Sequence, residues 1–390
     1  MHKIIHISSD EKFINSAYYQ FEKVSPNQNE FYIYGTIREN IKHIKLNDTF
    51  HFFELSQNFF ELFNDSIIIF HSLPNELIKY LQFINKSNKV VWLLFGFETY
   101  EDKLLYPDNV LLDTITYKHF KTKSNRFSFK EQLKYYLFPI IRKLKRDLYY
   151  SKQEYQIIRR NEKLNNLKRV DYFGFAFDEE YKFQCELLNI KRPFFYFGYY
   201  PLEFIVNIKI EIKQNKNKII IGHSGFPNGN HLDVINKIKN YNLSDVEVVI
   251  PFSYGEKNYI NFVKNEISSK NIEVTFLEDF IPLSDYSELL NDVKIAILNN
   301  RRQQAIGNII TLIYFGAKVF LSEKNTFYQF LKRQNIIIYN YENELNDNSI
   351  NFELTKEEMI FNKQKMIELF SEKKLLSGLQ SSIENGKNGK

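Results

Sequence analysis

A short polar loop follows an apolar strand in the second half of the chain. The run Ile219–Gly225 (IIIGHSG) leads through two asparagines into a helical pattern. Small residues let a ligand approach the backbone, and a helix N-terminus offers free N–H groups to a phosphate. The same pattern also fits an ordinary strand-to-helix turn, and it lacks the Gly-Lys-Ser/Thr of a Walker loop. The candidate nucleotide-sugar ligands in this loop are Gly222, Ser224, Gly225, Asn228 and His231.

A second polar loop, Asn299–Asn308 (NNRRQQAIGN), lies between an apolar strand and an apolar helix. Guanidinium groups pair with diphosphates, carboxamides bond sugar hydroxyls, and the following helix N-terminus would face the ligand. The alternative is a solvated turn with ordinary helix capping. Two arginines followed by two glutamines at the end of a strand favour a ligand site. The residues predicted to bind here are Arg302, Gln303, Gln304, Gly307 and Asn308, with Arg301 beside them.

A carboxylate and a histidine follow two apolar strands of the first half. Glu98 comes two residues after the run Val90–Gly96, and His71 directly follows the run Ser66–Phe70. At the edge of a sheet, Glu98 could act as general base on an acceptor hydroxyl, with His71 as the second candidate and Asp10 as a weaker one. The alternatives are a helix-capping acid and a structural histidine.

Several kinds of chemistry lack their sequence patterns. The chain has no Asp-x-Asp, no His/Cys/carboxylate cluster with metal-ligand spacing, and no G-x-G-x-x-G after its first strand. Its single cysteine, Cys185, cannot form an internal disulfide. We therefore expect a reaction without a metal or a dinucleotide cofactor.

The elements that must position these loops alternate between apolar strands and helical stretches. A chain of 390 residues with 44% hydrophobic residues predicts at least two domains with sizeable cores. Apolar runs without strict alternation suit parallel strands that are buried on both faces. We expect an α/β fold with two Rossmann-like domains facing across a cleft. The expected divisions are an N-terminal domain at 1–207, a C-terminal domain at 218–354, a terminal helix packing back at 355–372 and a frayed tail at 373–390.

A basic block stands out at residues 118–169, which hold 16 Lys/Arg against 4 Asp/Glu. Within it, 129–149 has an apolar stripe at helical spacing. The block fits a solvated face, a nucleic-acid site or a helix on an anionic membrane, and the stripe favours a membrane or a buried face over nucleic acid. No signal peptide or membrane span is expected. The residues expected to meet the membrane or acceptor are Lys134, Arg142, Lys143, Lys145 and Arg146.

From about residue 218 to 330 the sequence resembles the bacterial 4-acetamido-4,6-dideoxygalactose (Fuc4NAc) transferases of enterobacterial common antigen synthesis, glycosyltransferase family 56. The matching segments are IGHSG…N-H at 221–231, VVIPFSYG at 248–255 and RRQQAIGN at 301–308. In the first half, Gly96, Glu98 and Tyr100 match a W-G-x-D-x-Y pattern with Glu replacing Asp, and His71 falls on a family histidine.

This resemblance implies a GT-B fold, a dTDP-sugar donor and an undecaprenyl-diphosphate-linked saccharide as acceptor. The protein would then lie at the cytoplasmic face of the inner membrane as a peripheral protein that does not bind nucleic acid. Tyr254 and Tyr286 would lie near the nucleotide, with Glu323 as a ribose partner. Two other functions stay open: a GT-B transferase with a different nucleotide sugar acting on lipopolysaccharide or another glycan, and a nucleic-acid-binding α/β protein.

Overall fold

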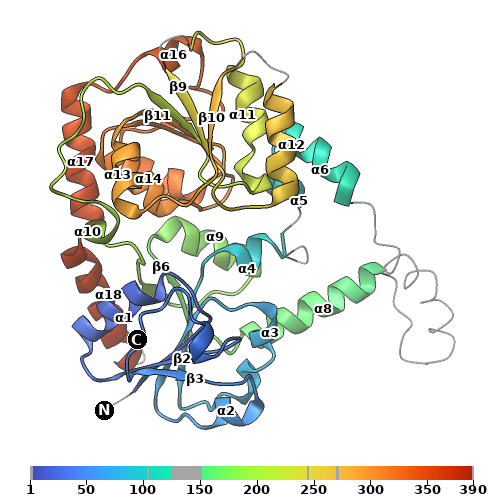
Figure 1. Ribbon diagram of the computed structural model, residues 1–390. Coiled ribbons are helices and arrows are strands. Elements are labelled where there is room, and N and C mark those ends of the chain that lie inside the picture. Colours follow the sequence, from blue (N-terminus) through green and yellow to red (C-terminus); the bar gives the residue numbers. More distant parts are fainter. Residues whose placement is uncertain are drawn as a thin grey trace.

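The computed structural model describes residues 3–102, 105–106, 108–124, 152–243, 246–268 and 272–388. These residues form two α/β units stacked one above the other, with the N-terminal unit below in Figure 1. The basic residues expected at the membrane, from Lys134 to Arg146, lie outside the described residues.

The sheet of the first unit is parallel in every strand pair of the described residues. Its order is β3-β2-β1-β4-β5-β6-β7. Successive strands are added toward one edge from β1 to β3 and toward the other edge from β4 onward, so the strand order reverses between β1 and β4. The strands are β1 (Ile4–Ser8), β2 (Asn29–Ile33), β3 (Phe50–Phe52), β4 (Ile67–His71), β5 (Lys89–Leu93), β6 (Tyr172–Phe175) and β7 (Phe194–Tyr196).

The second sheet repeats this plan in the order β10-β9-β8-β11-β12-β13, again with parallel pairs in the described residues. Its reversal lies between β8 and β11, and both polar loops of the sequence follow these two strands. The strands are β8 (Lys218–Ile221), β9 (Glu247–Pro251), β10 (Val274–Leu277), β11 (Val293–Leu298), β12 (Lys318–Leu321) and β13 (Tyr339–Asn340).

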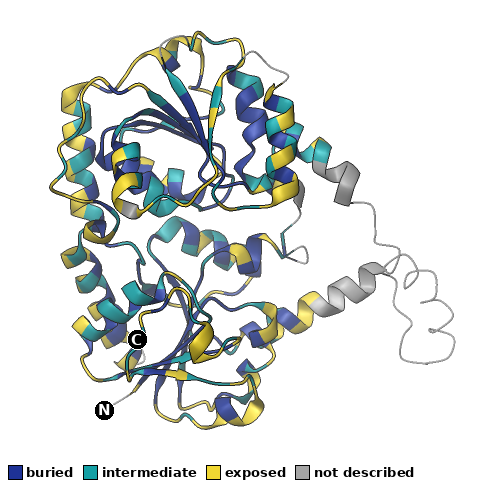
Figure 2. Cartoon of the chain, in the orientation of Figure 1, coloured by how far each residue is buried: buried dark blue, intermediate teal, exposed yellow. Residues whose placement is uncertain are grey.

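Helices cover both faces of each sheet, which is why the central strands are largely apolar. On β1, Ile5 and Ile7 join one buried cluster while Ile4 joins the cluster on the opposite face. Figure 2 shows the strands of both sheets as the most buried part of each unit. The helices of the first unit and its connections are α1 (Ile14–Val24), α2 (Gln57–Glu61), α3 (Asn75–Ile78), α4 (Phe97–Tyr100), α5 (Asp108–Leu111), α6 (Thr114–Ser124), α8 (Lys152–Leu167), α9 (Asp178–Leu188) and α10 (Leu202–Ile205).

The helices of the second half are α11 (His231–Ile238), α12 (Lys257–Ser268), α13 (Leu283–Asn291), α14 (Ile306–Tyr314), α15 (Thr326–Arg333), α16 (Asp347–Asn351), α17 (Lys356–Phe370) and α18 (Glu372–Asn388). The capping box at Thr355 opens α17. Short 3₁₀ turns lie at η1 (Arg38–Asn40), η2 (Leu81–Phe83) and η3 (Pro227–Gly229).

The expectation of a frayed tail at 373–390 is wrong, because α18 continues to Asn388. Leu375, Leu379 and Ile383 recur at intervals of four residues and are buried, the latter two against the first sheet. The helix lies beside α1 and β7, so the C-terminus returns to the N-terminal unit (Figure 1). The polar residues of this stretch had masked its apolar stripe.

The chain also crosses between the units in the other direction. Helix α6 belongs to the first half of the sequence but packs against α11 of the second unit. The Asp233 carboxylate accepts hydrogen bonds from the backbone of Ile115 and from the backbone and hydroxyl of Thr116, at 2.6–3.0 Å. A single boundary near residue 207 therefore does not separate the two units in space.

Candidate functional site

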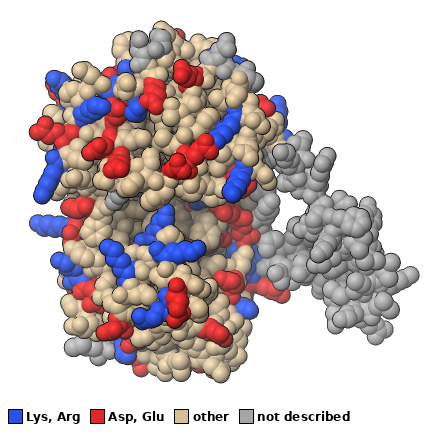
Figure 3. Space-filling view, in the orientation of Figure 1, with Lys and Arg blue, Asp and Glu red and all other residues tan. Residues whose placement is uncertain are grey.

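A cavity of about 650 Å³ lies where the carboxyl ends of the two sheets face each other. Figure 3 shows the surface hollowed between the two units, with Lys and Arg side chains along the lower rim. Ligands of open α/β sheets bind at such edges. The residues that line the cavity include Glu11, Lys12, Phe95, Tyr199 and Tyr200 from the first unit, and His223, Phe226, Tyr254, Arg302, Gln303, Gln304, Gly307 and Asn308 from the second.

The loop Arg302–Asn308, which was predicted to bind the nucleotide sugar, lines the cavity. Arg302 is 7% exposed, and its Nη2 lies 2.9 Å from an oxygen of Glu101. Its buried Nε atom has no hydrogen-bond partner among the residues that the structure describes. The Gln303 amide donates to the backbone oxygen of Phe95 at 2.6 Å, so this loop also joins the two units.

Helix α14 begins at Ile306, and Gly307 and Asn308 in its first turn line the cavity. Its positive dipole end and the Arg302 guanidinium therefore act on the same space. Together they make this part of the cavity suited to a diphosphate.

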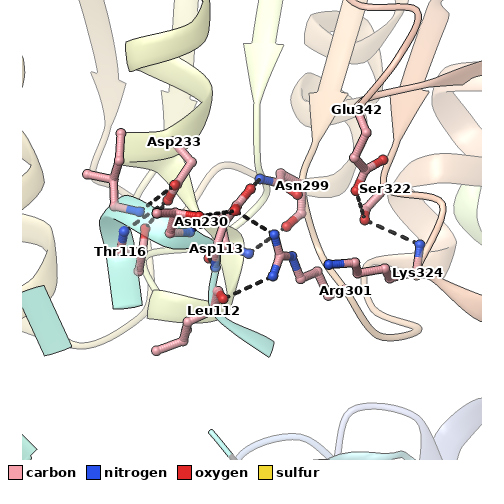
Figure 4. A network of polar contacts seen from close by, with 12 residues as sticks. Leu112, Asp113, Thr116, Asn230, Asp233, Asn299, Arg301, Ser322, Lys324 and Glu342 are labelled. Atoms are coloured by element: carbon pink, nitrogen blue, oxygen red, sulfur yellow. Dashed lines mark hydrogen bonds and ion pairs between the residues drawn. The ribbon is translucent and has the colours of Figure 1, made fainter. Parts of the chain in front are cut away.

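Arg301 has a different place from its neighbour. Its guanidinium forms an ion pair with Asp113 at 2.5 Å and donates to the backbone oxygen of Leu112. Figure 4 shows these contacts in one network with Asn230, Asn299 and Asp233. Arg301 thus fastens the α5–α6 connection to the second unit and does not line the cavity.

The loop after β8 supports the cavity in a way that the sequence did not indicate. A Cβ atom on Gly222 or Gly229 would lie 2.4 Å from the His231 ring, and one on Gly225 would lie 2.3 Å from Ile260. The small residues therefore make room for protein side chains rather than for a ligand. Gly222, Ser224, Gly225, Asn228 and His231 are all absent from the cavity lining.

His231 itself is fully buried beneath the loop. Its Nδ1 lies 3.0 Å from the hydroxyl of Tyr259, and burial lowers the pKa of His231 to about 3. The expectation that His231 contacts the nucleotide sugar is therefore not supported by its position. The neighbouring His223 lines the cavity instead, with its Nε2 3.2 Å from the Gln304 amide. Burial, followed by the charge of Arg302, lowers the pKa of His223 to about 3, so the ring is neutral at pH 7.

A recess of about 130 Å³ adjoins the cavity on the side of the second sheet. Tyr254 and Tyr286 both line it, as does the exposed ring of Phe280. The Lys12 ammonium from the first unit lies 5.9 Å from the Tyr254 ring and 5.7 Å from the Phe280 ring. Glu323 lies elsewhere: it is exposed and accepts a hydrogen bond from Asn340 at 2.8 Å.

The two predicted general bases lie behind the cavity wall. One oxygen of Glu98 accepts hydrogen bonds from the backbone of Leu73 and Phe95 and from the Trp92 indole. Its side chain is buried, and burial raises its pKa while these bonds oppose the rise. His71 is also buried, with both ring nitrogens in hydrogen bonds. Neither residue is among those that line the cavity.

The sequence reasoning missed Glu11, a carboxylate that does line the cavity. It follows β1, and burial raises its pKa, with a smaller opposing effect from the Ser9 hydroxyl. Its neighbour Asp10 instead accepts three backbone N–H groups, from Lys42, His43 and Ile44. The signal was present as two consecutive acids at a strand end, and only the first was considered.

Two features are absent from the part of the chain that the structure describes. Among residues 3–102, 105–106, 108–124, 152–243, 246–268 and 272–388, no group of three His, Cys, Asp or Glu side chains is placed to hold a metal ion. In that same part of the chain, no helix is both long and apolar enough to cross a membrane.

Comparison with known proteins gives a family and a fold. A family model described as 4-alpha-L-fucosyltransferase, glycosyl transferase group 56, matches residues 85–385. Among solved structures, Anabaena Alr3699/HepE in complex with UDP-glucose has 11% identity and a TM-score of 0.61, with 99% of each chain covered. The apo structure of OtsA has 10% identity and the same TM-score and coverage. An α,α-trehalose 6-phosphate synthase from Burkholderia multivorans has 8% identity and a TM-score of 0.59, with 100% of this chain and 99% of that chain covered. At such identities the likeness shows the fold alone, and it confirms the GT-B arrangement of two facing parallel sheets.

Proposed function

The chain belongs to glycosyl transferase group 56, and from this premise we propose that it moves a deoxy-amino sugar from a dTDP-sugar to an undecaprenyl-diphosphate-linked saccharide. Its family and fold identify it as a glycosyltransferase. The proposal adds the donor, the acceptor and a place at the cytoplasmic face of the inner membrane. These three follow from the resemblance to the Fuc4NAc transferases.

The single observation that carries the proposal is the meeting of Arg302 and the α14 N-terminus in one cavity between the sheets. A fixed guanidinium and a helix dipole stabilise a diphosphate most when it leaves with its extra charge. These groups lessen the need for a metal ion, and we propose transfer without one. Activity that persists in EDTA would support this part, and activity that requires Mg²⁺ would refute it.

The recess beside the cavity would hold the nucleoside. Tyr254, Tyr286 and Phe280 offer aromatic faces for a base, and the recess shares Asn308 with the diphosphate region. The carboxamides of Gln303 and Gln304 would bond the sugar between this recess and the first unit. The donor would thus lie mainly on the second unit.

Glu11 would act as general base in place of Glu98. It lines the cavity from the first unit, opposite the proposed donor region. A carboxylate with a raised pKa is a better proton acceptor. The acceptor hydroxyl would bond to the anomeric carbon, the bond from that carbon to the diphosphate oxygen would break, and the proton would pass to Glu11. The diphosphate would leave with the bonding electrons.

A panel of nucleotides in a thermal unfolding assay tests the donor assignment. A ligand that binds only the folded state raises the Tm, and the rise grows with the ratio of its concentration to its Kd. We expect dTDP to raise the Tm in the presence of EDTA, and ADP to leave it unchanged. Equal stabilisation by ADP, or no effect of dTDP, would contradict the proposed donor.

A further inference from the structure

A chain of buried hydrogen bonds leads from the cavity wall into the first sheet. The hydroxyl of Tyr199 lies 2.6 Å from His71 Nδ1, and His71 Nε2 lies 2.9 Å from His6 Nδ1. His6 Nε2 then lies 3.2 Å from the side-chain oxygen of Asn29. Both histidines and Asn29 are buried, whereas Tyr199 lines the cavity. The chain therefore connects an interior network to the space where a substrate would bind.

The direction of every bond in this chain follows from its inner end. The Asn29 amide nitrogen donates to Glu22 at 2.7 Å and to the backbone oxygen of Ser25 at 2.8 Å. These two acceptors orient the amide, so its oxygen faces His6, and His6 must donate from Nε2. Burial lowers the pKa of His6 to about 3, so the ring is neutral at pH 7 and its Nδ1 is an acceptor.

His71 is constrained by His6 in the same way. His6 Nδ1 accepts, so His71 must donate from Nε2. Burial and then the neighbouring His6 lower the pKa of His71, which leaves its Nδ1 unprotonated at pH 7. That nitrogen can only accept, and the Tyr199 hydroxyl donates its proton to it. The proton of Tyr199 is thus held inside the protein, and the lone pairs of its oxygen remain for a ligand.

We propose that Tyr199 is a substrate-binding residue that accepts a hydrogen bond from a sugar hydroxyl, and that His71 is the residue that positions it. This inference rests on the proposed function, because it requires a sugar in the cavity. The Tyr199 ring is held by Phe95 and Phe13, at centroid distances of 5.1 and 5.8 Å. The hydroxyl is therefore fixed in place before any ligand arrives.

This series of hydrogen bonds orients Tyr199 and does not carry protons away from the site. Its inner end is an amide, which accepts a hydrogen bond but does not take up a proton at neutral pH. Burial also disfavours the charged form of both rings. His71, which the sequence suggested as a base, thus acts through Tyr199.

Nitrogen NMR of the full chain labelled at histidine tests the arrangement without any substrate. We expect His6 and His71 as neutral Nε2–H tautomers at pH 7, and a change at His71 Nδ1 in the Tyr199→Phe variant. Variants at positions 6 and 71 assign the signals among the eight histidines. A His71 protonated at Nδ1 would overturn the proposal.

Adding ligands then tests whether Tyr199 binds a sugar, separately from the hydrogen bonds within the protein. dTDP alone, dTDP-glucose, and dTDP with N-acetylglucosamine are added, each at a concentration well above its Kd. A change at His71 Nδ1 with dTDP-glucose would place Tyr199 at the donor sugar, and a change only with added N-acetylglucosamine would place it at the acceptor. No change in either sugar arm would overturn the recognition role while dTDP binding still upholds the proposed donor. Absence of dTDP binding would overturn the proposed function and this inference with it.

Kinetic coupling gives an independent readout. A hydrogen bond to a neutral hydroxyl contributes about 1 kcal/mol, so Tyr199→Phe should raise the KM for one substrate by roughly five- to ten-fold with a smaller change in kcat. The double variant with His71→Phe should be no worse than Tyr199→Phe alone. Tyr200 lines the same cavity and is the matched control: Tyr200→Phe and His71→Phe should have additive effects. Additive effects for the Tyr199 pair would contradict the proposal.

Discussion

The adjacent residues Arg301 and Arg302 allow a direct test of the donor site. Arg302 lines the cavity, whereas Arg301 is paired with Asp113 outside it. Replacing each with Met keeps most of the aliphatic volume and removes one positive charge. The two variants differ only in which arginine is lost, so each serves as the control for the other.

The magnitudes follow from the surroundings of each guanidinium. A hydrogen bond to a charged group contributes about 1.5–3 kcal/mol, so Arg302→Met should weaken dTDP binding by roughly 10- to 150-fold. The ion pair between Arg302 and Glu101 changes this expected loss of affinity only slightly, because the Glu101 side chain is more than half exposed. Arg301→Met removes the ion-pair partner of Asp113 in a half-buried site and should lower the free energy of unfolding by about 2–4 kcal/mol.

Calorimetric titration with dTDP and thermal unfolding without ligand separate the two effects. We expect Arg302→Met to lose affinity with a Tm near that of the wild type, and Arg301→Met to lose Tm with near wild-type affinity. Equal dTDP affinity in Arg302→Met and wild type would refute the assignment of the diphosphate to this loop. A comparable loss of affinity in a folded Arg301→Met would refute the division of roles.

Three further outcomes are expected. Glu11→Gln should lower kcat by about 10²–10⁴-fold with little change in dTDP affinity. Because burial raises the pKa of Glu11, wild-type kcat should fall as the pH drops through that raised pKa, and the variant should lose this acid limb; a retained limb would exclude Glu11 as the base. Asp233→Leu removes the carboxylate that accepts hydrogen bonds from Thr116 at the start of α6. This variant should lower the free energy of unfolding, measured with urea, by about 1–3 kcal/mol. No change would mean that α6 is held by other contacts. Deleting residues 372–390 should lower the free energy of unfolding by about 1.5–3 kcal/mol for each buried apolar side chain of α18 that is removed. An unchanged Tm would mean that α18 does not stabilise the core of the first unit.

The fold was predictable because its central strands are buried on both faces. Such strands leave continuous apolar runs, as at Ile67–His71 and Val293–Leu298, which the sequence shows without ambiguity. The short edge strands β3 and β7 leave no such run in the sequence, since three residues give too little pattern. Helix α18 was missed because its apolar stripe is narrow and its other residues are polar.

Of the predicted site residues, those of the loop Arg302–Asn308 and Tyr254 line the cavity, and most of them are uncharged. Arg302 faces the cavity because a buried guanidinium needs a polar space beside it, and the motif around it marked that space. The glycines after β8 suggested close approach by a ligand, but the close approach is made by His231 at Gly222 and Gly229 and by Ile260 at Gly225. Glu98 suggested a base, but its oxygen serves the Trp92 indole and two backbone groups. A sequence shows that room or charge is present and does not show which partner uses it.

Transfer of labelled sugar tests the proposed reaction most directly. A dTDP-linked 4-acetamido-4,6-dideoxygalactose is incubated with the protein, an undecaprenyl-diphosphate-linked saccharide and EDTA, and the label in the lipid is measured together with released dTDP. We expect equal amounts of lipid-linked label and dTDP. No transfer, transfer that requires Mg²⁺, or dTDP release with the label free in water would contradict the proposed function.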